Sequence, residues 1–162
     1  MKELYNVSAI DINPKWENMI TRKKQISKRE NDIRSEFYRD YTRIINSRAF
    51  RRLKQKTQVF FATRNDHVCT RMEHVNNVSS ISFGIARYLG LNEELVMAIS
   101  AGHDLGHAPF GHSGERIINM ISKDYLKTDF WHEKNSLRFI DYCETIQNAS
   151  GQEENLNLTY AV

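Results

Sequence analysis

Apolar residues recur at helical spacing in five segments of the chain. The first segment begins at Ser35, and its apolar residues fall at i, i+4, i+7 and i+8 along one helix face: Phe37, Tyr41, Ile44 and Ile45. The same periodicity covers residues 70–90, 91–106, 115–126 and 132–146. A shorter run, TQVFFAT at residues 57–63, fits either a strand or a buried connector, because periodicity does not separate the two. The pattern therefore predicts an all-α fold.

A very short turn joins the second and third of these predicted helices. Gly90 suits the position just after a helix end, and Asn92 is a natural N-cap for the helix that follows. Because the turn is short, the two helices are expected to be antiparallel. His74 and His103 then lie at similar depths, each roughly 16–22 Å from the turn at about 1.5 Å per residue. This geometry permits a site that both histidines share.

The apolar faces of these helices predict part of the core. The face of the first comprises Met72, Val75, Val78, Ile81, Ile85 and Leu89, and that of the second Leu95, Val96 and Ile99. The final stretch, LNLTYAV, looks like the beginning of a further apolar helix. Domains rarely end on such a segment, so we expect an N-terminal portion of a larger protein. In that case the apolar side chains of Leu156, Leu158, Tyr160 and Val162 would be exposed in this chain and would favour association.

Composition narrows the class of protein. With 162 residues, 40% hydrophobic and 27% charged, the chain fits one soluble globular domain. We expect this domain at residues 34–162, after an N-terminal arm at residues 1–33. No apolar run approaches the roughly 18 residues of a membrane span, and the start lacks the apolar block of a signal peptide. Two isolated cysteines, Cys69 and Cys143, are typical of reduced thiols in a cytoplasmic protein.

Charge is distributed unevenly along the chain. Residues 15–56 carry 14 basic and 5 acidic residues, a net charge of +9 in a chain whose net charge is +3. Such a block attracts polyanions such as nucleotides or nucleic acid. It is equally typical of a solvated helix face with scattered ion pairs, and the sequence does not decide between the two.

The segment AGHDLGHAPFGHSGE, residues 101–115, concentrates histidine and glycine. His103 and Asp104 offer a neutral nitrogen and an anionic oxygen, a donor set that suits Mn²⁺, Fe²⁺, Mg²⁺ or Zn²⁺. His74, at matching depth, is the third candidate ligand. A single histidine is more often a hydrogen-bonded surface or core residue, but the density of the segment favours a divalent metal site.

A second pair in this segment suggests proton transfer. His112 and Glu115 are three residues apart at a helix start, so the carboxylate can accept a hydrogen bond from the imidazole. This arrangement is that of an oriented general acid/base. Beside a bound metal, it is the equipment of metal-assisted phosphoester hydrolysis.

These motifs resemble those of the HD-domain phosphohydrolases, specifically the deoxyguanosine triphosphate triphosphohydrolase branch. The resemblance covers residues 34–162, and its motifs are long: RSEFYRDYTRIINSRAFRRLKQKTQVF, TRMEH, HDLGHAPFGHSGE and FWHEKNSLRF. It implies an HD-domain helical bundle of which this chain is the N-terminal portion, incomplete at its C-terminus. It also implies hydrolysis of a deoxynucleoside triphosphate, with dGTP the first candidate, to deoxynucleoside and tripolyphosphate.

The resemblance assigns roles residue by residue. It makes His74, His103 and Asp104 metal ligands, His112 and Glu115 the catalytic pair, and His107 and His132 residues that line the triphosphate site. The matched signature also contains basic residues that could contact phosphates, or else form ion pairs: Arg48, Arg51, Arg52, Lys54 and Lys56.

The sequence departs from the family pattern at two points. Ala108 stands where the family commonly has proline. The family closes its metal site with a later aspartate, which the resemblance places beyond residue 162, since Asp124, Asp129 and Asp141 lie in other contexts. Weak activity of this form is therefore expected.

The resemblance also implies partners and leaves alternatives. It implies a homo-oligomer and, in some members, binding of single-stranded DNA. The absence of a long apolar run argues against a membrane partner. One alternative is a nucleotide- or DNA-binding fragment without catalysis. Another is an HD phosphohydrolase that acts on a different nucleotide, although the long signature at residues 34–60 argues against it.

Overall fold

The computed structural model describes residues 8–26, 31–59, 65, 67–148 and 150–162. Within them, most of the regular structure is helical. The α-helices are α1 (Trp16–Ile20), α2 (Glu36–Asn46), α3 (Arg48–Arg52), α4 (Arg71–Leu89), α5 (Glu93–Gly102), α6 (Gly111–Ile121) and α7 (His132–Arg138). Short 3₁₀ or π turns follow three of them: η2 (Leu53–Gln55), η3 (Ser122–Leu126) and η4 (Phe139–Cys143).

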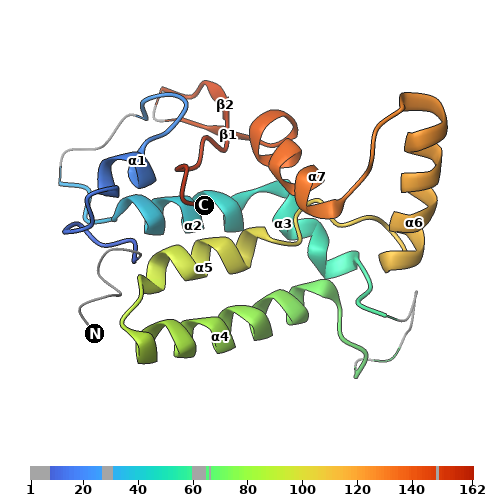
Figure 1. Ribbon diagram of the computed structural model, residues 1–162, viewed down its shortest axis with the longest axis horizontal. Coiled ribbons are helices and arrows are strands. Elements are labelled where there is room, and N and C mark those ends of the chain that lie inside the picture. The colour runs from blue at the N-terminus through green and yellow to red at the C-terminus, as the bar shows by residue number, and fades with distance from the viewer. Residues whose placement is uncertain (1–7, 27–30, 60–64, 66, 149) are drawn as a thin grey trace.

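Three helices form the body of the molecule, with α5 between α2 and α4 (Figure 1). Small residues make the close approach of α2 and α5 possible. Ala98 and Ala101 of α5 are buried against Ile44 of α2, and a Cβ on Gly102 would already touch the Ile44 side chain at 3.5 Å. This packing fixes the C-terminal end of α5, where the candidate ligands begin.

The predicted helix boundaries on either side of the α4–α5 turn are confirmed. Gly90 ends α4 with a left-handed φ of 69°, a conformation that costs glycine little. Asn92 caps α5, its side-chain oxygen accepting a hydrogen bond from the Leu95 N–H. Ser35 caps α2 in the same way, accepting from the Tyr38 N–H. At the other end of α4, Thr70 and Glu73 form a capping box.

The all-α prediction needs one correction. Strands β1 (Thr145–Gln147) and β2 (Glu153–Asn155) form an antiparallel hairpin, where the predicted fifth helix was expected to run on to residue 146. The turn between them has its own local cause: Asn148 Oδ1 accepts from the N–H groups of Ser150 and Gln152, and Gly151 has a φ of 79°. The described residues therefore form a mainly α fold with one small hairpin.

The expectation for the last seven residues was wrong. Residues 156–162 form no helix, and Thr159 pairs with Arg22 as an isolated β-bridge. Leu156 is completely buried in the core cluster, and Leu158 and Val162 pack against it. Of the four side chains expected on the surface, Tyr160 is the exposed one. The segment contributes to the core because it runs back across α2 instead of projecting from the domain.

The predicted apolar faces of α4 and α5 are only partly covered. Val75 is buried, but Ile81 is 56% exposed, and Ile85, Leu89 and Ile99 also face outward. The buried side of α5 consists instead of alanine, serine and glycine, because two helices pack against it at close range. The run TQVFFAT lies mostly outside the described residues; of its described part, Thr57 pairs with Thr70 and Val59 is exposed.

Part of the predicted N-terminal arm packs into the body of the molecule. Arg22 donates to the carboxylates of Glu36 and Asp40 in α2 and to the Asn157 carbonyl. Asp40, fully buried, also accepts from the Thr159 N–H and hydroxyl. This network joins the N-terminal segment, α2 and the C-terminal segment. The boundary at residue 33 stays a prediction.

In the described part of the chain, no helix has both the length and the apolar character needed to cross a membrane. Cys69 and Cys143 are both exposed and carry free thiols.

Candidate metal and acid–base site

Four elements bring five of the chain's six histidines together. His74 lies in the first turn of α4, and His103 and Asp104 follow directly on the end of α5. The loop at residues 105–110 leads to α6, which carries His112 and Glu115, while His132 begins α7. The histidine-rich segment thus meets two helices that are distant in sequence.

The structure brings the three predicted metal ligands together. One ligand atom from each of His74, His103 and Asp104 lies within 4.8 Å of the others, and the two imidazole centroids are 5.6 Å apart. The antiparallel pairing of α4 and α5 produces this arrangement, as their short turn predicts.

Hydrogen bonding orients His103 for a role as a ligand. Its Nδ1 lies 2.7 Å from the Ser100 carbonyl oxygen, which can only accept, so the Nδ1 position carries the proton. The lone pair is then on Nε2, which lies 3.6 Å from Asp104 Oδ2. A histidine held in this way by a backbone carbonyl is typical of metal-binding imidazoles.

Arg71 is a residue of this site that the sequence did not reveal. Its guanidinium donates to Asp104 Oδ2 at 2.7 Å, and both side chains are buried. Burial alone would raise the pKa of Asp104, but His103 and Arg71 outweigh it and hold that pKa below its usual value. Arg71 lies three residues before His74, one helical turn away, and this spacing was the available signal.

This donor set fits a divalent ion. Two imidazoles and an ionised carboxylate combine nitrogen and oxygen ligands, as Mn²⁺, Fe²⁺, Zn²⁺ and Mg²⁺ sites do in varying proportion. A buried carboxylate that stays ionised and a fixed His103 tautomer both favour cation binding.

A second cluster surrounds Glu115. Its Oε2 lies 3.4 Å from His112 Nδ1, the contact that their spacing predicts. Its Oε1 is held more tightly, since both the Nδ1 and the backbone N–H of His132 lie 2.9 Å away. Burial raises the pKa of Glu115, but the hydrogen bonds from His132 and His112 outweigh it and lower that pKa overall. Glu115 is therefore an anion anchored between two imidazoles.

His107 is the most buried histidine of the group, with 3% of its surface exposed. Its Nδ1 donates to the Ala108 carbonyl oxygen at 3.0 Å, while its Nε2 has no hydrogen-bond partner among the described residues. Its ring lies 4.8 Å from that of His132 and 5.5 Å from that of His112, centroid to centroid. Burial lowers the pKa of His107, so the neutral form is favoured.

The loop that carries His107 is fixed by α7. The Gly106 N–H donates to Ser136 Oγ at 2.9 Å, and Asn135 Nδ2 donates to the Gly106 carbonyl at 2.8 Å. Ser136 Oγ also reaches the carbonyl oxygens of His103 and His132. Ser136 and Asn135, which the sequence did not single out, therefore fix the position of the histidine loop relative to α7.

Gly106→Ala is expected to destabilise the protein by about 1–3 kcal/mol, in the range of overpacked cores. An added Cβ would lie 2.2 Å from the Ser136 backbone nitrogen and 2.4 Å from the Asn135 carbonyl carbon, so α7 must move away. Urea unfolding measures the change. Gly84→Ala is the matched control: its Cβ meets nothing within 4 Å inside α4, and alanine there should stabilise by about 0.5–1 kcal/mol. Equal responses of the two variants would contradict this packing.

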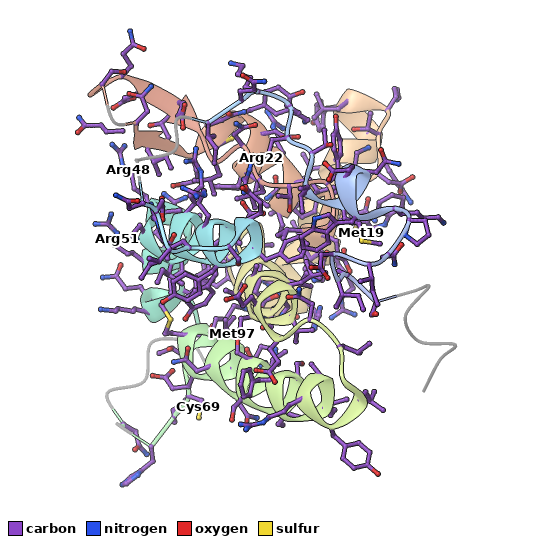
Figure 2. The ribbon with its side chains drawn as sticks, turned by 90° about the vertical axis from the view of Figure 1, so that its left-hand side faces the viewer. Met19, Arg22, Arg48, Arg51, Cys69 and Met97 are labelled. Atoms are coloured by element: carbon purple, nitrogen blue, oxygen red, sulfur yellow. The ribbon has the colours of Figure 1, made fainter. Side chains whose placement is uncertain are left out.

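The basic residues of the signature occupy different positions. Lys56 donates to the His107 carbonyl at 2.8 Å and so lies against the histidine loop; burial, with Arg52 and Arg71, lowers its pKa. Arg52 pairs with the buried Glu144 at 2.8 Å. Arg48 and Arg51 are exposed and project from one edge of the molecule (Figure 2).

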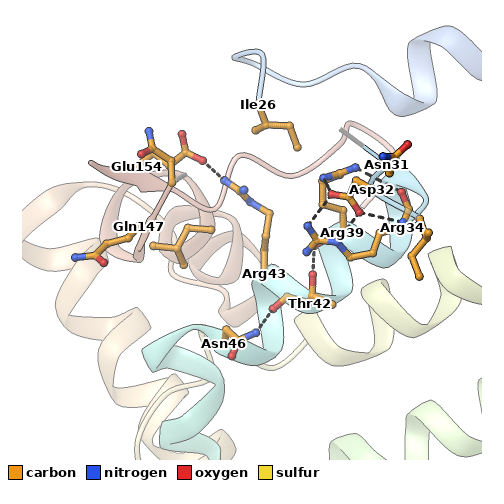
Figure 3. A pocket seen from close by; sticks show the side chains of 13 residues that line it. Ile26, Asn31, Asp32, Arg34, Arg39, Thr42, Arg43, Asn46, Gln147 and Glu154 are labelled. Carbon is orange, nitrogen blue, oxygen red and sulfur yellow. Dashed lines mark hydrogen bonds and ion pairs between the residues drawn. The ribbon is translucent and has the colours of Figure 1, made fainter. Parts of the chain in front are cut away.

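A cavity beside α2 is a different feature. It measures about 690 Å³ and lies between residues 31–46 and the hairpin (Figure 3). Its cations already have anionic partners: Asp32 pairs with Arg34 and Arg39, and Glu154 pairs with Arg43. The histidine clusters therefore remain the stronger candidate for chemistry.

Comparison with known proteins adds a family assignment to this geometry. A model of the HD domain matches residues 71–154, just over half of the chain. A protein from Caldanaerobacter subterraneus subsp. tengcongensis is 48% identical over 131 residues, which cover 81% of this chain and 36% of that protein. One from Clostridium tetani is 40% identical over 162 residues, covering 99% and 44% respectively. Both are named deoxyguanosinetriphosphate triphosphohydrolase-like protein, and the chain spans less than half of the length of either.

Proposed function

The chain belongs to the HD-domain family, and on that premise we propose that it takes part in the hydrolysis of deoxynucleoside triphosphates, with a divalent ion as cofactor. The products would be a deoxynucleoside and tripolyphosphate, and dGTP is the first candidate substrate because of the names of the relatives. The observation that supports this most strongly is the presence of two clusters on either side of the loop at residues 105–110. One is a ligand group of His74, His103 and Asp104, and the other is the His112–Glu115 pair.

The ligand group would hold the ion. A divalent ion in such a site polarises a phosphoryl oxygen and lowers the pKa of a bound water. The chain's own contribution is to keep three donors ready: the Ser100 carbonyl fixes the His103 tautomer, and Arg71 keeps Asp104 ionised.

His112 and Glu115 would handle protons. His112 is exposed, so its Nε2 can reach a substrate, while Nδ1 faces the Glu115 carboxylate. That carboxylate stabilises an imidazolium, so His112 can receive or deliver a proton at Nε2. His132 holds Glu115 in place through two hydrogen bonds.

The phosphate chain of a nucleotide would lie near the remaining polar groups. We propose His107, His132 and Lys56 as residues beside the triphosphate, since all three contact the histidine loop or each other. Arg48, Arg51 and Arg52 are proposed as more distant phosphate contacts. The exposed pair Arg48 and Arg51 is also the natural place for single-stranded DNA, and binding there should weaken steeply with salt.

Incubation of the protein with dGTP and Mn²⁺ or Mg²⁺ is expected to release tripolyphosphate above the level of an EDTA-treated control. Anion-exchange chromatography separates tripolyphosphate from pyrophosphate and phosphate, and the other dNTPs and GTP test the choice of base and sugar. Release of pyrophosphate with dGMP would contradict the proposed bond cleavage. Binding of dGTP in calorimetry without any turnover would favour the non-catalytic alternative. Light scattering on the same samples tests the expected homo-oligomer.

A further inference from the structure

One buried nitrogen of the cluster around Glu115, on His107, takes no part in the proton transfer proposed for His112 and Glu115. His107 Nε2 is buried and has no hydrogen-bond partner among the described residues. A buried polar atom of this kind ordinarily carries a cost of about 1–3 kcal/mol unless something satisfies it. It therefore points to a ligand.

The tautomer of His107 decides what kind of ligand fits. Its Nδ1–H donates to the Ala108 carbonyl, so Nε2 of the neutral ring presents a lone pair. Such a lone pair can bind a cation or accept a hydrogen bond from a donor. One ligand atom each from His107, His112 and Glu115 lies within 4.8 Å of the others.

Glu115 is also oriented in a way that suits binding of a cation. His132 donates to Oε1 twice, which fixes the carboxylate and leaves Oε2 directed at His112. Carboxylates that bind a metal ion are commonly held by hydrogen bonds from residues that do not bind the ion, the position that His132 has here. The donors then number two imidazole nitrogens and one carboxylate oxygen, the set found in His₂Glu zinc sites with an open fourth position.

We propose that His107, His112 and Glu115 form a second cation site, selective for Zn²⁺-like ions, and that occupation of this site inhibits hydrolysis. The inhibition rests on the proposed function. A zinc ion would occupy the lone pairs of His112 and Glu115, so the pair could no longer exchange protons with a substrate. Zinc binding and acid–base catalysis at this cluster are mutually exclusive for that reason.

Charges around the cluster favour such an ion only moderately. Glu115 supplies a negative charge within it, and Glu133 Oε1 lies 3.6 Å from His132 Nε2 at its rim. Lys56 and Arg71 on the side of the loop oppose a cation. We therefore expect the second ion to bind more weakly than the ion at His74, His103 and Asp104.

Zinc stoichiometry tests the site directly. The protein should first carry Cys69→Ser and Cys143→Ser, because both thiols are exposed and thiolates are metal ligands. Titration with Zn²⁺ against a chromophoric chelator should then give two ions per chain. His107→Asn, whose amide can still donate to the Ala108 carbonyl, should lose the weaker ion alone, and so should Glu115→Gln. His74→Asn should lose the other ion, and His67→Asn, at an exposed histidine outside both groups, should keep two.

The outcomes separate this inference from the proposed function. A parent protein that binds one ion, or His107→Asn with two ions, would overturn the second site whatever the activity. If His107→Asn fails to fold, His112→Asn replaces it, because that side chain is 79% exposed. In the dGTP assay at fixed Mn²⁺, added Zn²⁺ should reduce turnover as the weaker ion binds; unchanged turnover at full occupancy would overturn the inhibition. Two ions without any hydrolysis would sustain the site and count against the proposed function alone.

Discussion

Replacing His112 with alanine is expected to lower dGTP hydrolysis by about 10²–10⁴-fold, the usual contribution of a positioned acid/base. His112 is mostly exposed, with its Nδ1 3.4 Å from Glu115 Oε2, so the substitution removes a proton carrier without opening the core. The ion held by His74, His103 and Asp104 should remain bound. Initial rates with saturating dGTP and elemental analysis of the same sample measure both quantities.

Two further variants serve as comparisons for His112→Ala. Ser113→Ala, at an exposed neighbour in the same helical turn, should keep nearly full activity. Glu115→Gln should lower the rate as well, because a neutral amide stabilises an imidazolium less than a carboxylate does. Loss of the ion at the His74 group in His112→Ala would show that His112 is a ligand there and would refute its assignment as acid/base.

Local signals in the sequence were sufficient for the first cluster. A capping residue, a left-handed glycine and a turn of minimal length determined how α4 and α5 pair, and this pairing alone places His74 beside His103. The His112–Glu115 contact followed from helical spacing in the same way. These contacts were predictable because each depends on backbone geometry within one helix or one hairpin of helices.

The second cluster depended on tertiary structure that no local pattern contains. His132 lies 17 residues after Glu115, and the π turn η3 and the following segment decide where it returns. Its position beside Glu115 is thus a product of the path between two helices. Resemblance to a family had brought His132 into the site, but only as a residue beside the triphosphate.

The errors in the fold have physical causes of the same kind. Apolar spacing that continues through Ile146 predicts a helix where the hairpin at residues 145–155 lies, although Asn148 and Gly151 are ordinary turn signals. Leu156 was expected on the surface, yet a segment of the chain can bury its apolar residues without forming a helix. Periodicity identifies which apolar residues share one face of a helix. It does not identify which other segment of the chain packs against that face.

Breaking the buried pair of Arg71 and Asp104 is expected to have a large effect on stability. Asp104→Leu leaves the Arg71 guanidinium buried without its carboxylate partner, and removing one member of such a pair costs about 3–5 kcal/mol. The free energy of unfolding should be measured in urea with EDTA present, so that loss of a bound ion does not contribute. Both side chains are only 4% exposed, so water cannot replace the missing partner.

A double variant tests whether Asp104 contributes to stability through its pairing with Arg71. Arg71→Met with Asp104→Leu removes both charges and should recover much of the stability that Asp104→Leu loses, because buried ion pairs are often replaceable by apolar residues. The exposed pair of Lys123 and Asp129, 2.7 Å apart, is the matched control, and Asp129→Leu should change stability by less than about 1 kcal/mol. A double variant no more stable than Asp104→Leu would mean that Asp104 supports the fold through contacts other than Arg71. The double variant should still fail to bind the ion, because it recovers stability without restoring the Asp104 carboxylate, which is the proposed ligand.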